Sequence, residues 1–242
     1  MSRPFAAFDI DGTLIRWQLY HAMADELARR GHIEEATYQK IKDIRMTWKQ
    51  RSHADSFDEY ERGLVGLLET ALTKIKESDF EAASHSVLEE YRDQVYAYTR
   101  DLIKKLRTDN YLLFAVSASP SLLVKLIAEY YQFDDYGGSV YEIKEGYFTG
   151  NLDLLKSTAK PEFLKKLVEK HGASWQRSIA VGDSEGDIPM LSIVERPLAF
   201  NPSRELFDHA KKAGWKIAIE RKNMTYELEP QDGSYILAQT NG

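Results

Sequence analysis

The feature that most limits how this chain can fold is a short apolar run near its N-terminus that stops at two aspartates. Between Phe5 and Ile10 the only charged residue is Asp9, which favours a strand buried on both faces of a parallel sheet. The run breaks at Asp11 and Gly12, where glycine lets the backbone turn back or approach a ligand closely. Two carboxylates so close together are costly to bury without a cation. The pair therefore indicates either a capped turn or a site for a hard divalent ion such as Mg²⁺.

Composition narrows the classes of function. The 242 residues suffice for one large domain or two moderate ones, and 43% of them are hydrophobic, enough for a sizeable core. A formal net charge of −6 argues against a protein that binds nucleic acid through a basic face. The absence of cysteine excludes disulfides, zinc–thiolate sites and a thiol nucleophile. No apolar run approaches roughly 20 residues and no signal-peptide pattern is present, so we expect a cytoplasmic protein without a membrane partner.

Residues 16–107 are expected to form an inserted, all-helical module. Residues 17–107 contain no proline, and apolar side chains recur at helical spacing, as at Leu64, Leu68 and Leu72. The last helix of the module, over about residues 79–107, is expected to return the chain to the main body. Helices alone, placed directly after a strand, predict a unit separate from the sheet.

The other parts of the chain, residues 1–15 and 108–222, alternate between short apolar runs and helical segments. This alternation predicts an α/β fold with a Rossmann-like parallel sheet core flanked by helices. Residues 138–150 contain a Glu-Gly turn between two alternating segments, which predicts a β-hairpin. The polar residues 223–242 receive no predicted role. Strands are expected at 5–10, 111–116, 178–181, 197–200 and 215–219, and helices at 121–131, from 160, from 188 and at 203–213.

Ligands of open α/β sheets bind beyond the carboxyl ends of the strands, and the polar residues at these predicted ends are the candidates for a site. Asp9 and Asp11 follow the first strand, Ser117 ends the second, and Asp183 follows the third. Lys160 begins the helix that precedes the strand of Asp183. Parallel strands would gather these side chains at one edge of the sheet.

Each candidate, taken alone, has a simpler structural interpretation. Asp183 and Asp187 are four residues apart and suit a helix N-cap followed by an acidic first turn. Ser117 lies before a turn that contains proline, where serine is ordinary, and a lone Lys160 is typical of a solvated surface. Only the combination of these residues favours a functional site.

In combination, these residues resemble the motifs of the haloacid dehalogenase (HAD) superfamily, in its phosphoserine-phosphatase-like branch (subfamily IB) with a helical cap. The first motif matches residues 9–14 (DIDGTL), and the second matches Ser117. The third matches Lys160 within Ala-Lys-Pro-Glu, and the fourth matches residues 182–190 (GDSEGDIPM). The order and spacing of the motifs agree over about residues 4–220.

The resemblance implies a phosphatase that is Mg²⁺-dependent and acts on a small phosphomonoester. Asp9 would be the nucleophile that forms an aspartyl-phosphate, and Asp11 would be the general acid and base. Lys160 and Ser117 would complete the catalytic group by neutralising and hydrogen-bonding the phosphoryl oxygens. Mg²⁺ would be held by Asp9, the backbone carbonyl of Asp11, Asp183 and, directly or at one remove, Asp187. This account requires the side chains of Asp9 and Asp183 to lie within about 10 Å, the limit for one bridging ion.

The same resemblance assigns substrate contacts to the catalytic loops and the cap. The candidates are Gly12, Thr13, Ser117, Ala118, Lys160, Gln18 and Arg45. Arg45 shares a helical face with Trp48 and Lys49 and is a candidate for meeting an anionic part of the substrate. The cap as a whole would exclude water and select the leaving group.

The chain departs from phosphoserine phosphatases at two positions. Gln18 replaces a glutamate that binds the substrate's amino group in those enzymes, and Gly186 replaces an asparagine that contacts phosphate. An amide binds an ammonium group less well than a carboxylate does. A phosphotransferase with the same intermediate, a phosphoserine phosphatase proper and a non-catalytic binding protein therefore stay as alternatives. The sequence predicts neither the physiological substrate nor the oligomeric state.

Overall fold

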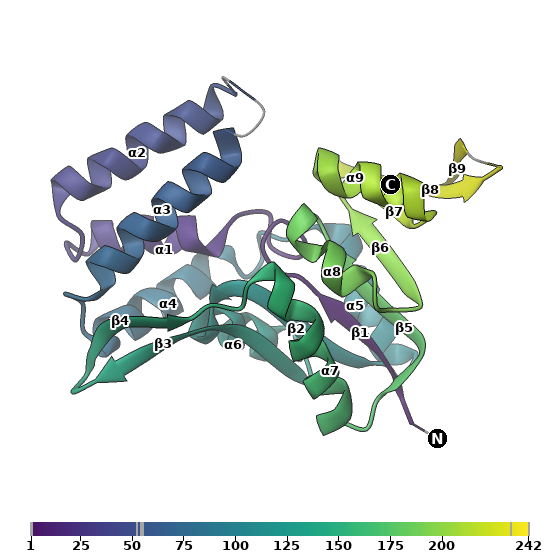
Figure 1. The fold of residues 1–242 in the computed structure, drawn as a ribbon, viewed down its shortest axis with the longest axis horizontal. Coiled ribbons are helices and arrows are strands. Elements are labelled where there is room, and N and C mark those ends of the chain that lie inside the picture. Colours follow the sequence, from purple (N-terminus) through teal and green to yellow (C-terminus); the bar gives the residue numbers. More distant parts are fainter. Residues whose placement is uncertain (1, 52, 54–55, 233, 242) are drawn as a thin grey trace.

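The computed structural model describes residues 2–51, 53, 56–232 and 234–241. In this part of the chain, nine strands form one sheet in the order β4-β3-β2-β1-β5-β6-β7-β8-β9 (Figure 1). Parallel pairing joins β3 through to β7, and antiparallel pairing adds β4 at one edge and β8 and β9 at the other. The strands are β1 (Pro4–Phe8), β2 (Leu112–Pro120), β3 (Asp135–Lys144), β4 (Tyr147–Asp153), β5 (Ser174–Gly182), β6 (Arg196–Phe200), β7 (Lys216–Arg221), β8 (Met224–Gln231) and β9 (Ser234–Asn241).

The central strand β1 is buried on both faces, as its sequence predicts. Phe5 and Ala7 belong to one hydrophobic cluster, and Ala6 and Phe8 belong to the other. Successive side chains of a strand point to opposite faces, so this division places a core on each side of the sheet. One core is covered by α7 (Lys160–Lys170), α8 (Ile188–Leu191) and α9 (Arg204–Ala213), and the other by α5 (Ala97–Thr108) and α6 (Ser121–Tyr130). The predicted α/β fold with a mostly parallel sheet is confirmed.

The helical module begins directly after the first motif. The predicted range, residues 16–107, contains α1 (Leu19–Arg29), α2 (Glu35–Lys49), α3 (Ser56–Leu72) and α4 (Glu77–Tyr91), followed by nearly all of α5, which packs on the sheet. Helices α1, α2 and α3 lie beside the end of the sheet that carries β3 and β4 (Figure 1). The phenolic oxygens of Tyr20 on α1 and Tyr141 on β3 are 2.6 Å apart and connect the module to the sheet.

One helix predicted over residues 79–107 is wrong, because the structure has two helices there, α4 and α5. The segment between them is extended, and Val95 forms an isolated bridge with Ile15. The N–H of Tyr96 donates to the carbonyl of Leu14 at 3.0 Å, and the hydroxyl of Thr99 donates to the carbonyl of Thr13 at 2.9 Å. Pairing with the first motif therefore ends α4 at a point where the local sequence carries no breaker.

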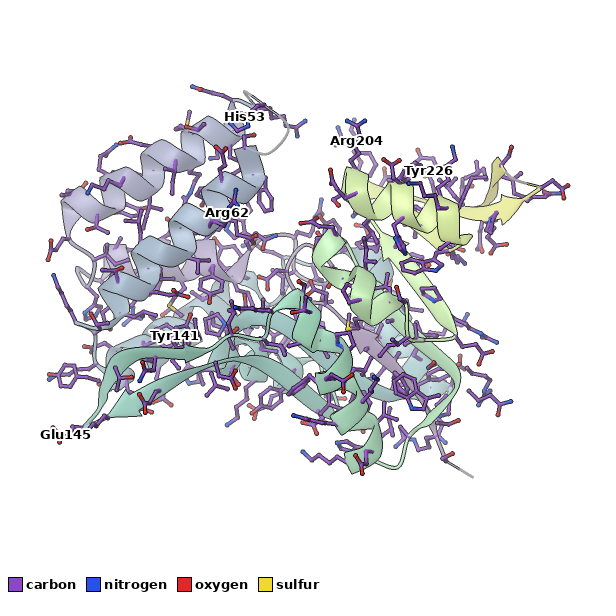
Figure 2. The ribbon with its side chains drawn as sticks, viewed as in Figure 1. His53, Arg62, Tyr141, Glu145, Arg204 and Tyr226 are labelled. Atoms are coloured by element: carbon purple, nitrogen blue, oxygen red, sulfur yellow. The ribbon has the colours of Figure 1, made fainter. Side chains whose placement is uncertain are left out.

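The predicted hairpin is confirmed as β3 and β4. Glu145 has φ 53° and Gly146 has φ 77°, so both turn residues are left-handed, as in tight hairpin turns. Tyr141 projects from β3, and Glu145 lies at the tip (Figure 2). The described part of residues 223–242, which received no predicted role, extends the sheet as β8 and β9. The predicted ranges also include residues 1, 52, 54, 55, 233 and 242, which lie outside the described residues.

Among the described helices, none combines the length and the apolar character needed to cross a lipid bilayer.

Candidate active site

The carboxyl ends of β1 and β5 bring two aspartates together. The N–H of Asp9, just after β1, donates to the carbonyl of Val181 in β5 at 2.9 Å, which fixes the backbone at this edge. Asp183 directly follows β5, and Asp187 lies one turn further on. Carboxylate oxygens of Asp9, Asp183 and Asp187 lie within 4.8 Å of one another. The separation is well inside the limit of about 10 Å that a shared ion requires.

Gly12 allows the first motif to fold against Asp183. The φ of Gly12 is +74°, and a Cβ atom there would lie 2.1 Å from Oδ2 of Asp183. A side chain at this position would therefore be strained by the backbone and would collide with a carboxylate. The next residue, Thr13, donates its hydroxyl to Oδ1 of Asp183 at 3.3 Å. The loop is thus closed against the aspartate of the fourth motif.

Lys160 supplies a buried positive charge at the centre of these acids. Its Nζ donates to Oδ1 of Asp9 at 2.8 Å and to Oδ1 of Asp187 at 2.6 Å. Burial raises the pKa of Asp9, and the Lys160 ammonium offsets part of that effect. Burial raises the pKa of Asp183 as well, and the neighbouring charges of Asp9 and Asp187 add to it. Burial alone would lower the pKa of Lys160, but Asp187 and Asp9 raise it above its ordinary value.

Asp187 is held by the turn that follows β5. Its Oδ2 accepts the N–H groups of Asp183 at 3.1 Å and of Ser184 at 3.2 Å. Its Oδ1 is the atom bound by Lys160. Both oxygens of Asp187 are thus engaged by protein donors, whereas the carboxylate of Asp183 accepts the hydroxyl of Thr13 through Oδ1. Asp187 therefore orients Lys160 and the loop of Asp183.

Asp11 has a hydrogen-bonding environment of its own. Its Oδ1 accepts the N–H of Leu19, at the start of α1, at 2.5 Å. Its Oδ2 accepts the hydroxyls of Ser117 and Ser119, each at 2.8 Å. Burial raises the pKa of Asp11, and these three donors oppose the rise. A buried carboxyl with a raised pKa suits a group that carries a proton and passes it on.

The donor set fits a hard divalent cation. Asp9 and Asp183 are buried or half-buried carboxylates whose pKa values are raised by lost solvation and by the charge of neighbouring carboxylates, Asp187 among them in both cases. A cation between the two would relieve both effects, and oxygen is the ligand atom that Mg²⁺ prefers. Asp9 and Asp183 are therefore the residues that would hold the ion, with Asp187 supporting them.

The structure places the other predicted substrate residues less directly. Ala118 lies between the two serines that bind Asp11, and its carbonyl accepts the hydroxyl of Ser139. Gln18 is half-buried and immediately precedes α1, next to the loop of Asp11. The guanidinium of Arg45 donates hydrogen bonds to other residues of the cap: to the carboxylate of Asp25 at 2.8 and 2.9 Å and to the hydroxyl of Tyr60 at 3.0 Å. Its predicted contact with substrate stays a prediction.

Sequence reasoning missed Ser119. Its hydroxyl lies 2.8 Å from Oδ2 of Asp11, the same distance as the hydroxyl of Ser117. Its N–H donates to the Ser117 hydroxyl at 3.0 Å. The available signal was the Ser-x-Ser spacing, since alternate residues of a strand end share a face.

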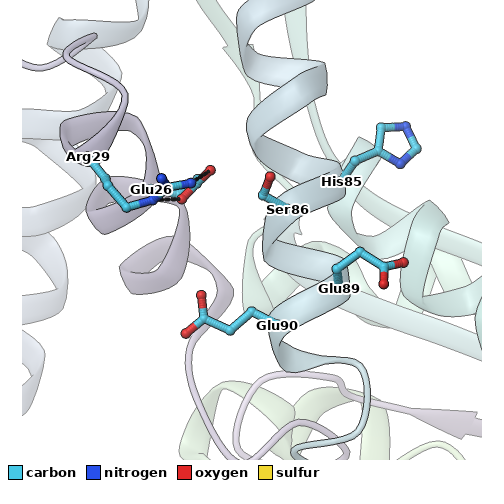
Figure 3. Close-up of a pocket in the computed structure, with 6 residues that line it drawn as sticks. All are labelled: Glu26, Arg29, His85, Ser86, Glu89 and Glu90. Atoms are coloured by element: carbon cyan, nitrogen blue, oxygen red, sulfur yellow. Dashed lines mark hydrogen bonds and ion pairs between the residues drawn. The ribbon is translucent and has the colours of Figure 1, made fainter.

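A pocket of about 540 Å³ lies between α1 and α4 (Figure 3). It contains none of the residues predicted for the site. Glu26, at its wall, is already bound by Arg29 and Arg30, which lower its pKa. This pocket is therefore separate from the carboxylate cluster. It is lined by Glu26, Arg29, His85, Ser86, Glu89 and Glu90.

Comparisons with known proteins agree with the geometry. A family model described as haloacid dehalogenase-like hydrolase matches residues 6–192. Phosphoserine phosphatase SerB1 of Mycobacterium tuberculosis is 32% identical over 127 residues, which cover 52% of this chain and 41% of that protein. The chain thus spans about two fifths of the length of that relative.

Two further matches extend over most of the chain. Phosphoserine phosphatase of Methanocaldococcus jannaschii is 28% identical over 219 residues, 90% of this chain and 92% of that protein. A solved structure described as a phospho-aspartyl intermediate analogue of phosphoserine phosphatase has a TM-score of 0.63 and 23% identity. That match covers 92% of this chain and 95% of the solved chain, and it shows a shared fold.

Proposed function

Because the chain belongs to the family of haloacid dehalogenase-like hydrolases, we propose that it is a Mg²⁺-dependent phosphatase of a small phosphorylated metabolite. The observation that carries the proposal is the contact of Lys160 with Asp9 beside Asp183. It brings together a candidate nucleophile (Asp9), a positive side chain (Lys160) and a carboxylate that could bind a metal (Asp183). Phosphate monoesters hydrolyse extremely slowly without a catalyst, and enzymes accelerate this reaction by up to roughly 10²¹-fold. A catalyst must therefore supply a nucleophile, a positive environment and a proton donor together.

Asp9 is the proposed nucleophile. A carboxylate oxygen of Asp9 forms a bond to phosphorus while the bond between phosphorus and the ester oxygen breaks, giving an aspartyl-phosphate. Lys160 donates to Oδ1 of Asp9 and keeps that oxygen in place, and its charge offsets the charge of the phosphoryl group. A bound Mg²⁺ would supply further charge neutralisation between the carboxylates and the phosphoryl oxygens.

Asp11 is the proposed proton carrier. In its acidic form it protonates the departing ester oxygen, and it then accepts a proton from the water that attacks the aspartyl-phosphate. The second step breaks the bond between phosphorus and Asp9 and releases inorganic phosphate. Leu19, Ser117 and Ser119 hold both carboxyl oxygens of Asp11 during this exchange.

Hydrolysis of p-nitrophenyl phosphate tests the proposal. We expect phosphate release that requires Mg²⁺, stops with EDTA and is abolished by Asp9→Asn. Asp208→Asn, an exposed aspartate on α9, serves as the matched control and should retain activity. Release that persists in Asp9→Asn or in EDTA would refute the proposal.

The same reaction run in excess glycerol distinguishes hydrolysis from transfer. A phosphatase gives mainly inorganic phosphate, whereas a phosphotransferase gives glycerol phosphate as the main product. For phosphoserine, the relative from Methanocaldococcus jannaschii is the supporting observation, and the neutral amide of Gln18 is the opposing one.

A further inference from the structure

A second pocket lies where the cap meets the main body, at the hairpin of β3 and β4. This cavity, the hairpin pocket, has a volume of about 240 Å³ and is lined by residues of α4, the start of α6 and the hairpin. None of the described residues that were predicted for the active site lines it. A water molecule takes up roughly 30 Å³ of liquid, so the hairpin pocket offers room for a molecule of about eight non-hydrogen atoms.

Aromatic rings form one wall of the hairpin pocket. They belong to Phe80 on α4, Tyr141 on β3 (Figure 2) and Phe148 on β4. The ring centroids lie 5.2 Å apart for Phe80 and Phe148, 5.9 Å for Tyr141 and Phe148, and 6.5 Å for Phe80 and Tyr141. Because the rings already pack on one another, this wall does not have to be ordered when a ligand binds.

Two further apolar side chains of the hairpin pocket are open to solvent. Val140 is 54% exposed and Ile143 is 39% exposed, and both lie on β3 and line the pocket. A single exposed apolar residue is ordinary, but two of them beside an apolar cavity make a continuous surface of the kind that ligands cover. The apolar part of a ligand would remove this surface from water, which is favourable.

The charge at the hairpin pocket is negative. The charged residues among those that line it are Glu77 and Glu81, which are exposed and lie four residues apart on α4. Within the described part of the chain, neither carboxylate has an ion pair or a hydrogen bond. The field of the helix N-terminus accounts for Glu77, which lies in the first turn, but not for Glu81. Like charges at this spacing on a helix repel each other, so a cation between them would be stabilising.

We propose that the hairpin pocket binds a small, free ammonium compound that has an apolar body. The ammonium group lies between Glu77 and Glu81, and the apolar body lies against the aromatic wall and Val140. Room for about eight atoms, enclosed by three separate elements, suits a free small molecule and not a segment of another protein. The inference goes beyond the proposed phosphatase function and does not depend on it, because the pocket shares no residue with the candidate active site.

Occupation of the hairpin pocket would strengthen the junction between the cap and the main body. At this junction the N–H of Glu77 donates to the carbonyl of Gly146 at 2.9 Å, and Lys76 forms an isolated bridge with Tyr147. A ligand that touches α4 and the hairpin at once adds to these contacts. Because such a ligand binds the folded protein alone, it should raise Tm.

Four compounds of graded charge and size test the inference: hexylammonium, 1-hexanol, hexanoate and methylammonium. Each is titrated into the protein at neutral pH, and its Kd is measured by isothermal titration calorimetry. We expect hexylammonium to bind about tenfold more tightly than hexanol, which keeps the apolar chain but lacks the charge that two exposed carboxylates attract. Methylammonium should bind at least about tenfold more weakly than hexylammonium, because it lacks the methylene groups that the cavity buries. Hexanoate should not bind.

The outcomes separate the parts of the inference. Equal Kd values for hexylammonium and hexanol would overturn the role of the carboxylates, and equal values for hexylammonium and methylammonium would overturn the role of the cavity. If hexylammonium neither binds nor raises Tm, the inference fails and the phosphatase proposal is unaffected. Tighter binding of N-acetyl-lysine methylamide than of hexylammonium would also overturn it, in favour of a lysine of a partner chain.

Charge variants locate the ammonium group. The double variant Glu77→Gln with Glu81→Gln should weaken the binding of hexylammonium about tenfold and leave that of hexanol unchanged. The control is Glu89→Gln with Glu90→Gln, which removes the same charge from exposed positions of the same helix and should leave both Kd values unchanged. Equal effects of the two double variants would assign the attraction to the overall negative charge of the protein and overturn the inference.

Val140→Ser locates the apolar body of the ligand. This change at an exposed position should weaken the binding of hexylammonium by about threefold to tenfold and leave that of methylammonium unchanged. Ile236→Ser is the control, because Ile236 is 45% exposed on β9 and does not line the pocket. A comparable loss in both variants would contradict the proposed location. Asp9→Asn should bind hexylammonium with an unchanged Kd, and a lost affinity in that variant would place the ligand at the carboxylate cluster instead.

Discussion

Lys160 and Asp187 form a buried ion pair of 2.6 Å at the centre of the carboxylate cluster. The ammonium group is shared with Asp9, so one lysine balances two acids, and Asp183 lies within reach of both. The fold therefore concentrates negative charge around one buried cation before any metal binds. We therefore expect stability, metal affinity and activity to depend on one another.

Lys160→Met is the first test of this coupling. Removal of one partner of a buried pair leaves unpaired charges and should reduce the free energy of unfolding by about 3–5 kcal/mol in EDTA. Mg²⁺ should restore part of this loss, because a divalent ion takes over the balance of charge. Urea unfolding with and without Mg²⁺ measures both effects.

Lys165→Met is the control on the same helix. Lys165 is exposed and pairs with Glu162 at 2.6 Å, so its loss should cost less than about 1 kcal/mol. Equal losses for the two variants would contradict a special role of the buried pair.

Gly12→Ala tests the contact of the first motif with Asp183. A methyl group there would lie 2.1 Å from a carboxylate oxygen of Asp183, so the loop must move. We expect kcat/KM to fall by at least about a hundredfold, the effect of a displacement near 1 Å at reacting groups.

Gly31→Ala separates this collision from backbone strain. Gly31 has φ +78°, close to the value of Gly12, but no atom lies within 4 Å of its would-be Cβ. The variant should lose about 1–2 kcal/mol of stability and keep its activity. A comparable loss of activity in both variants would assign the effect of Gly12→Ala to strain alone.

Ser119→Ala tests the residue that sequence reasoning missed. Its hydroxyl donates to Oδ2 of Asp11 at 2.8 Å, and the loss of a hydrogen bond to an ionisable group should lower kcat by about tenfold. Ser192→Ala is the control, since that exposed hydroxyl only donates to the carbonyl of Ile188. An unchanged kcat for Ser119→Ala would show that the hydrogen bond from Ser119 to Asp11 does not contribute to activity.

His21 should make stability depend on pH. Burial, and secondarily the charge of Arg45, lower the pKa of His21 from 6.5 to about 3. Between pH 6.5 and pH 3, His21 is therefore protonated in the unfolded chain and neutral in the folded protein. The free energy of unfolding then decreases as the pH falls through this range. The free energy of unfolding should decrease by about 2 kcal/mol from this group between pH 7 and pH 5. The difference between the native protein and His21→Phe, followed by urea unfolding across this range, isolates the effect; a difference independent of pH would contradict the lowered pKa.

Much of the fold was predictable because its central strands, such as β1 and β2, are buried on both faces. Runs such as residues 111–116 have no polar alternation, and this pattern belongs to a sheet covered by helices on both sides. The break between α4 and α5 was not predictable, because hydrogen bonds to Leu14 and Thr13, distant in sequence, determine it. The strands β8 and β9 escaped prediction for a similar reason. Their polar residues are held by tertiary contacts, such as the ion pair of 2.5 Å between Lys216 and Glu227.

The sequence predicted which residues come together at the candidate site better than it predicted the contacts among them. Strand ends placed Asp9, Asp11, Ser117 and Asp183 at one edge, and the structure brings their loops together there. The sequence did not indicate that Arg45 would be engaged by Asp25, because that pair joins separate helices of the cap. The chemical roles of all these residues stay predictions until activity is measured.

The two ends of the helical insert, near Ile15 and Val95, are hydrogen-bonded to each other. Leu14 accepts the N–H of Tyr96, and Ile15 forms a bridge with Val95, so the two junctions of the helical insert are adjacent. The strands β1 and β2, which flank the insert in sequence, pair directly. An insert attached in this way can be lengthened, shortened or exchanged without rethreading the sheet. The proposed function therefore predicts that changes in the insert alter substrate choice and leave the carboxylate cluster beneath it intact.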